Sequence, residues 1–494
     1  MSDEQDRDLE IRREQVLHAV TRIWDIDPGN RAPMLGLPSA AASAAWPARE
    51  GTLPNREGSA AELGRRYRCG ELSPVEAMRQ TLARAEDVQP KLNAFIRLLP
   101  ERALAAAKAS EERFRHGQPL GPLDGVPVAA KDIIDVAGVP TTAASKVLLD
   151  NIAGEDAPVV RRLEAGGAIV FAKTNLHEFA YGGTGDVSQF GPCRNPRNPE
   201  HMTGGSSSGS GAAVGAGVCS IALGTDTGGS VRIPAAACGI VGLKPTYGRV
   251  STAGVIPLSW SLDHIGPMTA TVEDAALALS GMCDFDMPPL PVSIDSLKLG
   301  ICREHFFSRL DAEVRRIVEA ALARLGELHE VSIPHITIGA AAQTVITAAE
   351  AANFHKRWLE TRPGDYNMGI RNRLQAASQV SGVDYVQALR IRGLLLEEME
   401  AALAGVDVLA MPALPIPAPR LFSTDVQVEE GSLNVIAAMI RNTAPINFTG
   451  FPAISIPCGQ TAAGLPVGLQ LVAGAGQDGR LLQIAQACEA ILSR

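Results

Sequence analysis

Short apolar segments that alternate with helical ones constrain the fold of this chain most strongly. The stretch APVVRRLEAGGAIVFAKTN, residues 157–175, has a helical pattern, two glycines and then a run of apolar β-formers. LDGVPVAAKDIIDVAGV at 123–139 contains similar apolar runs, and AAVGAGVCSIALGTD at 212–226 pairs a small-residue helix with an apolar strand. Strands without polar alternation need cover on both faces. The pattern predicts an α/β fold, with a mixed, mainly parallel central β-sheet covered by helices on both faces.

Capping signals and further apolar runs extend this pattern along the chain. Ser73, Pro74 and Glu76 form a capping box with proline at the first helical position, so a helix is expected to begin there. An alanine-rich helix is expected at 101–115. Near the C-terminus, FPAISIPCG and LPVGLQLVAG are strand-like, and GRLLQIAQACEAIL predicts a closing helix.

The first 57 residues differ in composition from the rest. A charged helical piece from about Asp8 to Trp24 precedes a stretch rich in Pro, Gly and Ala. We predict a helical and extended N-terminal extension that either covers the body or mediates contacts in a homodimer. The predicted organisation is an extension at 1–57 and a body at 58–494, with its core at about 58–290 and 400–494 and a variable helical substrate-side region at about 290–430.

Composition argues against several classes of function. The formal net charge is −9, aromatic residues make up 4% and no basic stripe is present, so neither nucleic acid nor a membrane is an expected partner. The eight cysteines form no CxxC pair and the nine histidines no HExxH pattern, so no metal and no cofactor is predicted. The N-terminus lacks an apolar signal segment, and no apolar run reaches transmembrane length, which predicts a cytoplasmic protein.

Lys131 stands at the end of an apolar run, in GVPVAAKDII. Burial disfavours a charged ammonium, so a lysine there is expected to have a lowered pKa. A neutral lysine can act as a general base. The alternative is an ion pair between Lys131 and the adjacent Asp132, and the sequence leaves both readings open.

The stretch GTDTGGSVRIPAAACG, residues 224–239, places Ser230 directly after Gly228 and Gly229. Two glycines allow a tight turn whose backbone N–H groups face one point. Hydroxyl attack on a carbonyl, with the oxyanion held by backbone donors, suits this arrangement. A Ser-Lys system of this kind needs no histidine.

The loop TGGSSSGSG, residues 203–211, lies within a long irregular segment at 186–211. Such a segment is too long for a simple connection inside a compact domain. It lacks the lysine of a phosphate-binding loop, and no buried strand precedes it, so it is neither a phosphate loop nor a nucleophile elbow.

Together these three stretches resemble the amidase signature family. The resemblance rests on VPVAAKDIIDVAG, GGSSSGSGAAV and GTDTGGSVRIPAAACGIVGLKPTYGRV, with NLHEFAYGG and SLDHIGPM between and after them. It covers about 58–290 and resumes in TGFPAISIPCG and GLPVGLQLVA. The family implies a Ser-Ser-Lys triad, an acyl-enzyme and hydrolysis of amides.

The resemblance also implies roles for individual residues. Ser230 matches the nucleophile, Ser206 the bridging serine, whose preceding peptide bond is usually cis in this family, and Lys131 the base. The sequence has Ser208 where the family often has Gly, which makes Ser206 and Ser207 harder to tell apart; the spacing favours Ser206. The implied oxyanion hole is formed by Thr227, Gly228, Gly229 and Ser230, and the implied supporting residues are Ser207, Asp226 and Arg232.

Three hypotheses for function follow. The first is a free-standing amidase that cleaves a small-molecule amide, such as an aryl amide or carbamate, with side esterase activity. The second is the glutamine-hydrolysing subunit of a tRNA-dependent amidotransferase; Ile440 stands where that subunit is expected to have Asp, although Arg371 or Arg373 can serve a substrate carboxylate. The third is a catalytically silent scaffold. Candidate substrate-pocket residues are His177, Phe179, Tyr181, Trp358 and Met439.

Overall fold

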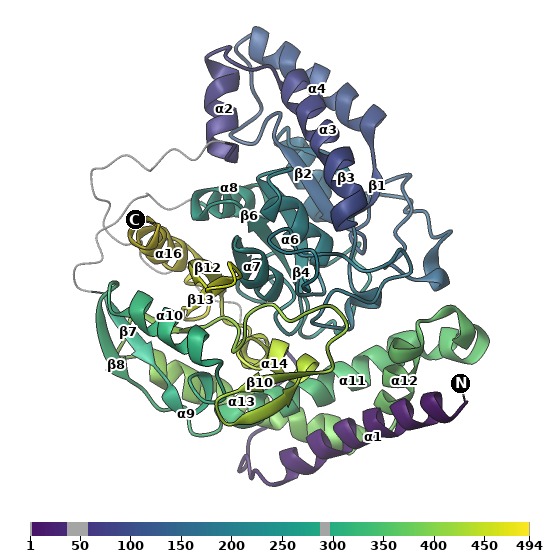
Figure 1. The fold of residues 1–494 in the computed structure, drawn as a ribbon, viewed down its shortest axis with the longest axis vertical. Helices are drawn as coiled ribbons and strands as arrows, with labels where there is room; N and C mark the ends of the chain where they lie inside the picture. Colours follow the sequence, from purple (N-terminus) through teal and green to yellow (C-terminus); the bar gives the residue numbers. More distant parts are fainter. Residues whose placement is uncertain (1, 37–57, 287–296, 494) are drawn as a thin grey trace.

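In the computed structural model, which describes residues 2–36, 58–286 and 297–493, one large sheet runs through the molecule (Figure 1). It has eleven strands. In spatial order they are β1 (Phe95–Leu98), β3 (Ile169–Thr174), β2 (Pro127–Lys131), β4 (Ile221–Asp226), β6 (His264–Thr269), β5 (Val241–Lys244), β12 (Ala453–Gln460), β13 (Pro466–Val472), β9 (Val408–Pro412), β7 (Lys298–Ile301) and β8 (Glu327–Glu330). A separate hairpin consists of β10 (Asp425–Val428) and β11 (Gly431–Asn434).

Helices connect many of these strands. The α-helices are α1 (Ser2–Trp24), α2 (Ala60–Arg68), α3 (Pro74–Leu92), α4 (Pro100–Arg115), α5 (Pro158–Ala165), α6 (Ser208–Gly215), α7 (Arg232–Cys238), α8 (Val272–Met282), α9 (Arg303–Phe306), α10 (Ala312–Leu322), α11 (Ile336–Thr361), α12 (Met368–Ala377), α13 (Gly382–Leu403), α14 (Val435–Ile440), α15 (Ala444–Thr449) and α16 (Asp478–Leu492). Short 3₁₀ turns are η1 (Lys146–Leu148), η2 (Glu178–Ala180) and η3 (Pro363–Asp365). The capping box predicted at Ser73 and Glu76 is confirmed at the start of α3.

The sheet is mixed, as the sequence predicts. Parallel pairing joins β3, β2 and β4, and again β9, β7 and β8. The other six neighbouring pairs are antiparallel, so antiparallel pairs outnumber the four parallel ones. They include the β12–β13 hairpin and the pair of β5 and β6, which run in opposite directions. The parallel part therefore lies where short strands alternate with helices along the sequence.

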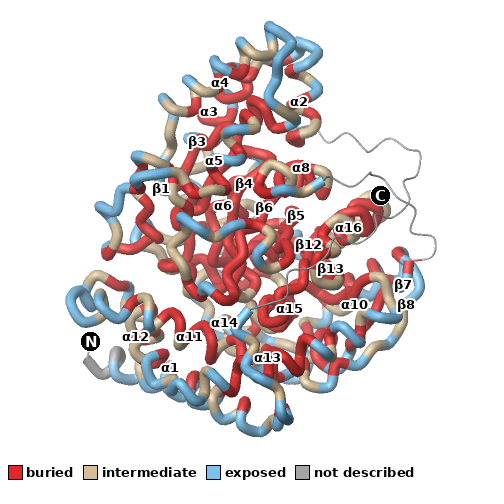
Figure 2. Tube along the Cα trace, turned by 180° about the vertical axis from the view of Figure 1, so that it is seen from behind, coloured by how far each residue is buried: buried red, intermediate tan, exposed pale blue. Residues whose placement is uncertain are grey.

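Both faces of the sheet are covered, which the continuous apolar strands predict. In β2 the side chains of Val128 and Ala130 enter one core cluster, and Ala129 enters the other. The same alternation holds in β4. Figure 2 shows the buried sheet interior with exposed residues concentrated on the outer helices.

The N-terminal helix α1 lies along the helices of the middle region (Figure 1). It packs against α11, α12 and α13. Trp24 Nε1 donates to Asp384 at 2.9 Å, and Asn372 Nδ2 donates to Asp8 at 2.8 Å. The rest of the predicted extension, 37–57, falls outside the described residues. The homodimer and the cytoplasmic location stay predictions.

The region predicted as helical, at about 290–430, contains α10 to α13 but also supplies strands to the sheet. β7 and β8 form one edge of the sheet, next to β9. β8 has the sequence ELHE and is mostly exposed, so it lacks the apolar pattern that marks the central strands. Among the helices of the described chain, none combines the length and the hydropathy needed to cross a membrane.

Candidate active site

The site is built at the ends of two parallel strands. Lys131 is the last residue of β2, and Asp226 is the last residue of β4. Open α/β sheets bind ligands beyond the carboxyl ends of parallel strands. The loop after β4 leads through Ser230 into α7, and the TGGSSSGSG loop leads into α6, so four segments meet at this edge.

Lys131 is fully buried and has serine and threonine hydroxyls as partners. Its Nζ lies 2.7 Å from Ser206 Oγ and 2.8 Å from Thr225 Oγ1. Burial lowers the pKa of Lys131 to about 7, although Asp263 and Asp226 oppose the shift. The sequence left open a pair with Asp132; that carboxylate instead lies 2.9 Å from Lys173. Lys131 is therefore available as a neutral amine near pH 7.

The two candidate bridging serines have different partners. Ser206, which follows a cis peptide bond to Gly205, contacts the lysine. Ser207 Oγ donates to the carbonyl of Thr225 at 3.2 Å, and its N–H donates to the carbonyl of Ser230 at 3.3 Å. Ser206 thus faces the amine, while Ser207 ties the loop to the segment that carries Ser230.

The peptide unit between Gly228 and Gly229 is held by a hydrogen bond at each end. Thr443 Oγ1 donates to the carbonyl of Gly228 at 2.6 Å, and the N–H of Gly229 donates to Asp226 at 2.8 Å. Gly229 has φ of +128°, and a Cβ there would lie 2.1 Å from Thr443 Oγ1, so only glycine fits.

This turn leaves specific backbone donors free. The N–H of Gly229, one of the four predicted oxyanion donors, is already occupied by the Asp226 carboxylate. In the part of the chain that the structure describes, the N–H groups of Thr227, Gly228 and Ser230 have no acceptor. Gln343 Nε2 donates to the carbonyl of Thr227 at 3.2 Å, which fixes the peptide unit that carries the Gly228 N–H.

Asp226 and Arg232 form a buried ion pair beneath the turn. Arg232 Nη2 lies 2.9 Å from Asp226 Oδ1, and both side chains are fully buried. Arg232 also donates to Gln470 at 2.6 Å and to Asn447 at 2.5 Å. The guanidinium holds the pKa of the Asp226 carboxyl well below its usual range, against the effect of burial.

We expect Arg232→Leu to lower the free energy of unfolding by about 3–5 kcal/mol, because it leaves a buried carboxylate without its counter-ion. Urea denaturation followed by circular dichroism measures this change. Arg420→Leu is the matched control: its pair with Glu200 is about two-thirds exposed on both sides and is expected to contribute about 1 kcal/mol or less. Equal losses in the two variants would contradict the structural role of the buried pair.

Besides Thr443 and Gln343, two residues of the site were not identified from the sequence. Thr225 contacts Lys131 directly, and Asp263 accepts a hydrogen bond from Thr227 Oγ1 at 2.5 Å. Burial raises the pKa of Asp263 to about 7. Asp263 lies in SLDHIGPM, where a carboxylate next to an apolar strand was a usable signal; Thr225 gave none.

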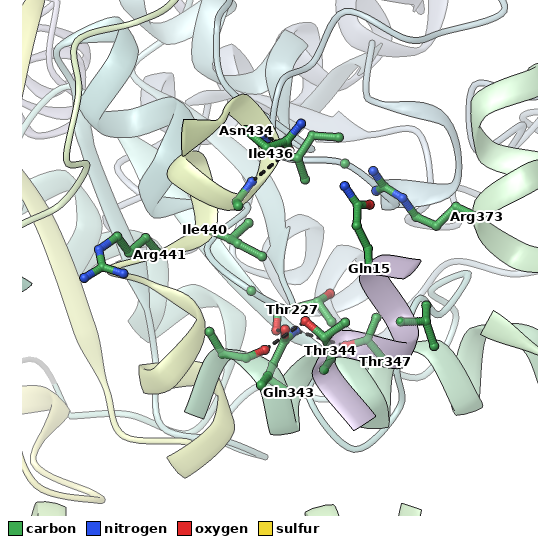
Figure 3. Close-up of a pocket in the computed structure, with 18 of the residues that line it drawn as sticks. Gln15, Thr227, Gln343, Thr344, Thr347, Arg373, Asn434, Ile436, Ile440 and Arg441 are labelled. Carbon is green, nitrogen blue, oxygen red and sulfur yellow. Dashed lines mark hydrogen bonds between the residues drawn. The ribbon is translucent and has the colours of Figure 1, made fainter. Parts of the chain in front are cut away.

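A cavity of about 460 Å³ opens beside these groups (Figure 3). Thr227, Gly228 and Ser230 line it, and α1, α11 and the region of α14 form further parts of its wall. Its volume suits a small-molecule ligand. The pocket thus places Ser230 where a small substrate can reach it.

Only one of the five predicted pocket residues lines this cavity, namely Tyr181. His177 is buried beside the turn at Gly182, where burial lowers its pKa to about 4. Phe179 stacks on Trp358 with ring centroids 6.3 Å apart, and Met439 is fully buried in a core cluster. The other four residues pack around the pocket and do not line it. Their place in the sequence does not distinguish a pocket residue from a packing residue.

Arg373 and Ile440, both noted from the sequence, do line the cavity, whereas Arg371 does not. The described residues contain no group of three or more His, Cys, Asp or Glu that could hold a metal ion.

Comparisons with known proteins identify the family of the chain. A family model described as Amidase matches residues 76–482. The A subunit of the glutamyl-tRNA(Gln) amidotransferase of Geobacter metallireducens is 37% identical over 472 residues, covering 87% of this chain and 96% of the relative. The corresponding protein of Myxococcus xanthus is 40% identical over 470 residues, with 87% and 96% covered.

Solved structures are also similar. One described as "Crystal structure of amidase" has a TM-score of 0.84 and 38% identity, covering 88% of this chain and 100% of the other. One described as "An unexpected vestigial protein complex reveals the evolutionary origins of an s-triazine catabolic enzyme" has a TM-score of 0.84 and 33% identity, with 87% and 98% covered.

Proposed function

Because the chain belongs to the amidase signature family, we propose that it hydrolyses the C–N bond of an amide through an acyl-enzyme on Ser230. The observation that carries this proposal is the fully buried Lys131, whose amine lies 2.7 Å from the Ser206 hydroxyl and whose pKa is lowered to about 7 by burial. An amine of this kind can accept a proton at neutral pH.

The proposed reaction has two halves. Lys131 accepts a proton from Ser206 as Ser206 accepts one from Ser230, and Ser230 Oγ attacks the amide carbon. The backbone N–H groups of Gly228 and Ser230, with that of Thr227, stabilise the oxyanion. The proton returns through Ser206 to the leaving nitrogen, the C–N bond breaks, and water then hydrolyses the ester by the same proton path.

Two substrate classes compete. The names of the curated relatives favour the second hypothesis, a glutamine-hydrolysing subunit, over the free-standing amidase. The pocket favours the free-standing amidase, because Ile440 lines it and no Asp or Glu is among its described lining residues, so an α-ammonium group would find no carboxylate there.

The experiment is a product-release assay on the isolated protein. Glutamine, primary aliphatic amides, anilides, aryl carbamates and p-nitrophenyl esters are compared, with ammonia or amine release as the readout. Turnover of non-glutamine amides supports the free-standing amidase, and turnover of glutamine alone supports the glutamine-hydrolysing subunit. No turnover, together with no labelling of Ser230 by a fluorophosphonate probe, would overturn the proposal and favour the silent scaffold.

A further inference from the structure

The lining of the pocket carries an excess of positive charge. Five arginines line it, and its described lining contains no Asp or Glu, although the chain as a whole has a net charge of −9. Two of the five come from α1, outside the part of the sequence that resembles the family. The arginines are Arg12, Arg22, Arg309, Arg373 and Arg441.

One part of this charge is formed by Arg12 and Arg373. The guanidinium of Arg373 lies 5.0 Å from the Tyr181 ring centroid and donates to the Tyr181 carbonyl. Burial and the nearby Arg12 lower the pKa of Arg373 to about 10, and Asp8 opposes this. Arg12 lies 3.4 Å from Asp8, and its Nε is buried without a hydrogen-bond partner. One carboxylate therefore faces two guanidinium groups here.

The other part is formed by Arg22, Arg309 and Arg441. Arg441 donates to Ser308 Oγ at 2.8 Å and to a backbone carbonyl, and its Nε is buried without a partner. Burial lowers the pKa of Arg441, as do Arg309 and Arg22, while Glu430 raises it. Within the described residues, none of these three arginines has a carboxylate within ion-pair distance. In Figure 3, Arg441 and Arg373 lie on opposite sides of the pocket, with Thr227 between them.

We propose that this pocket binds an amide that carries a carboxylate on each side of the scissile bond, and that α1 selects this substrate through Arg12 and Arg22. Like charges held together in a partly buried pocket repel one another, and an anionic ligand removes this repulsion. Guanidinium groups bind carboxylates through paired charge-assisted hydrogen bonds. The proposal rests on the proposed function at Ser230, and it identifies the chemical class of the substrate.

This substrate differs from glutamine in a specific way. Glutamine brings one carboxylate and one ammonium group, and the ammonium would stand among arginines. A dianionic amide instead brings one carboxylate to Arg12 and Arg373 and another to Arg22 and Arg441. The inference therefore predicts weak binding of glutamine by this chain.

Binding is tested separately from chemistry, by titration calorimetry on the Ser230→Ala protein. Four matched probes are compared: N-succinylglycine, with two carboxylates; N-butanoylglycine and N-succinylethylamine, with one each; and N-ethylbutanamide, with none. Each carboxylate is expected to tighten binding about 10- to 100-fold. Equal affinities, no binding of N-succinylglycine at millimolar concentration, or tighter binding of the neutral probe would overturn the inference. If the affinities are as expected but the wild-type protein shows no Ser230-dependent hydrolysis, only the proposed function is overturned.

Variants of α1 test its part in the selection. Arg12→Gln and Arg22→Gln are each expected to weaken N-succinylglycine binding about tenfold and to leave the binding of N-ethylbutanamide unchanged. Arg13→Gln is the matched control, because Arg13 is exposed on the same helix and does not line the pocket. An equal effect of all three variants, or no effect of Arg12→Gln and Arg22→Gln, would contradict the role of α1.

Discussion

Replacement of Ser230 by alanine is expected to lower amide and ester hydrolysis by about 10³- to 10⁶-fold, because the variant has no group that can form the acyl-enzyme. The N–H groups of the turn stay in place, so residual binding is expected to persist. Hydrolysis of p-nitrophenyl acetate and of a responsive amide measures the loss, and intact-protein mass spectrometry measures acylation. Ser230→Ala is expected to show no acyl adduct.

The matched control is Ser208→Ala in the neighbouring loop. Ser208 is buried, and its Oγ donates to the carbonyl of Asn175 at 3.4 Å, away from Lys131. This variant is expected to keep its activity within about threefold, since it removes only weak hydrogen bonds, to the Asn175 carbonyl and to the Cys193 thiol. Persistent acylation of Ser230→Ala would place the nucleophile elsewhere.

Replacement of Lys131 by methionine is expected to lower hydrolysis by at least about 10³-fold, since Ser206 then has no base to receive its proton. In the wild-type protein, activity requires neutral Lys131, whose pKa is about 7 because of burial. The rate is therefore expected to fall as pH decreases through about 7 and to level off above it. A pH–rate profile of acylation measures this limb, and its absence would contradict Lys131 as the base.

The pH dependence of stability tests independently of catalysis whether Lys131 is buried as a neutral amine. The ordinary pKa of lysine is 10.5, and the folded value is about 7, so between these pH values the unfolded chain binds a proton that the folded protein lacks. The free energy of unfolding contributed by Lys131 therefore rises with pH across this window. Urea denaturation at several pH values is expected to show this rise in the wild-type protein relative to Lys131→Met. A parallel dependence in the two proteins would contradict the buried neutral amine.

Much of the fold was predictable, because local patterns coincide with it. β2, β3 and β4 are apolar throughout and follow recognisable helix signals, so both their type and their burial follow from the sequence. β7 and β8 were not predicted: each has only four residues, and β8, the edge strand, is mostly exposed and polar. β7 is placed by its pairing with β9, which is distant in the sequence, and β8 by its pairing with β7.

The site, too, was predictable in part. Lys131, Ser206 and Ser230 lie in motifs that the resemblance identifies, and the first two are in contact in the structure. The contacts of Thr225 with the amine and of Gln343 with Thr227 depend on the meeting of separate elements, which no local pattern reports. The same holds for the pocket wall, because α1 reaches it by packing on helices more than 300 residues away.

The position of α1 has a consequence for how such an enzyme can diversify. The proposed hydrolytic groups lie between residues 131 and 230, whereas Arg12 and Arg22 belong to α1. Sequence change confined to α1 would alter one wall of the pocket and leave the proton path untouched. Paralogues that share the reaction centre but differ in α1 are expected to have diverged in substrate rather than in reaction chemistry.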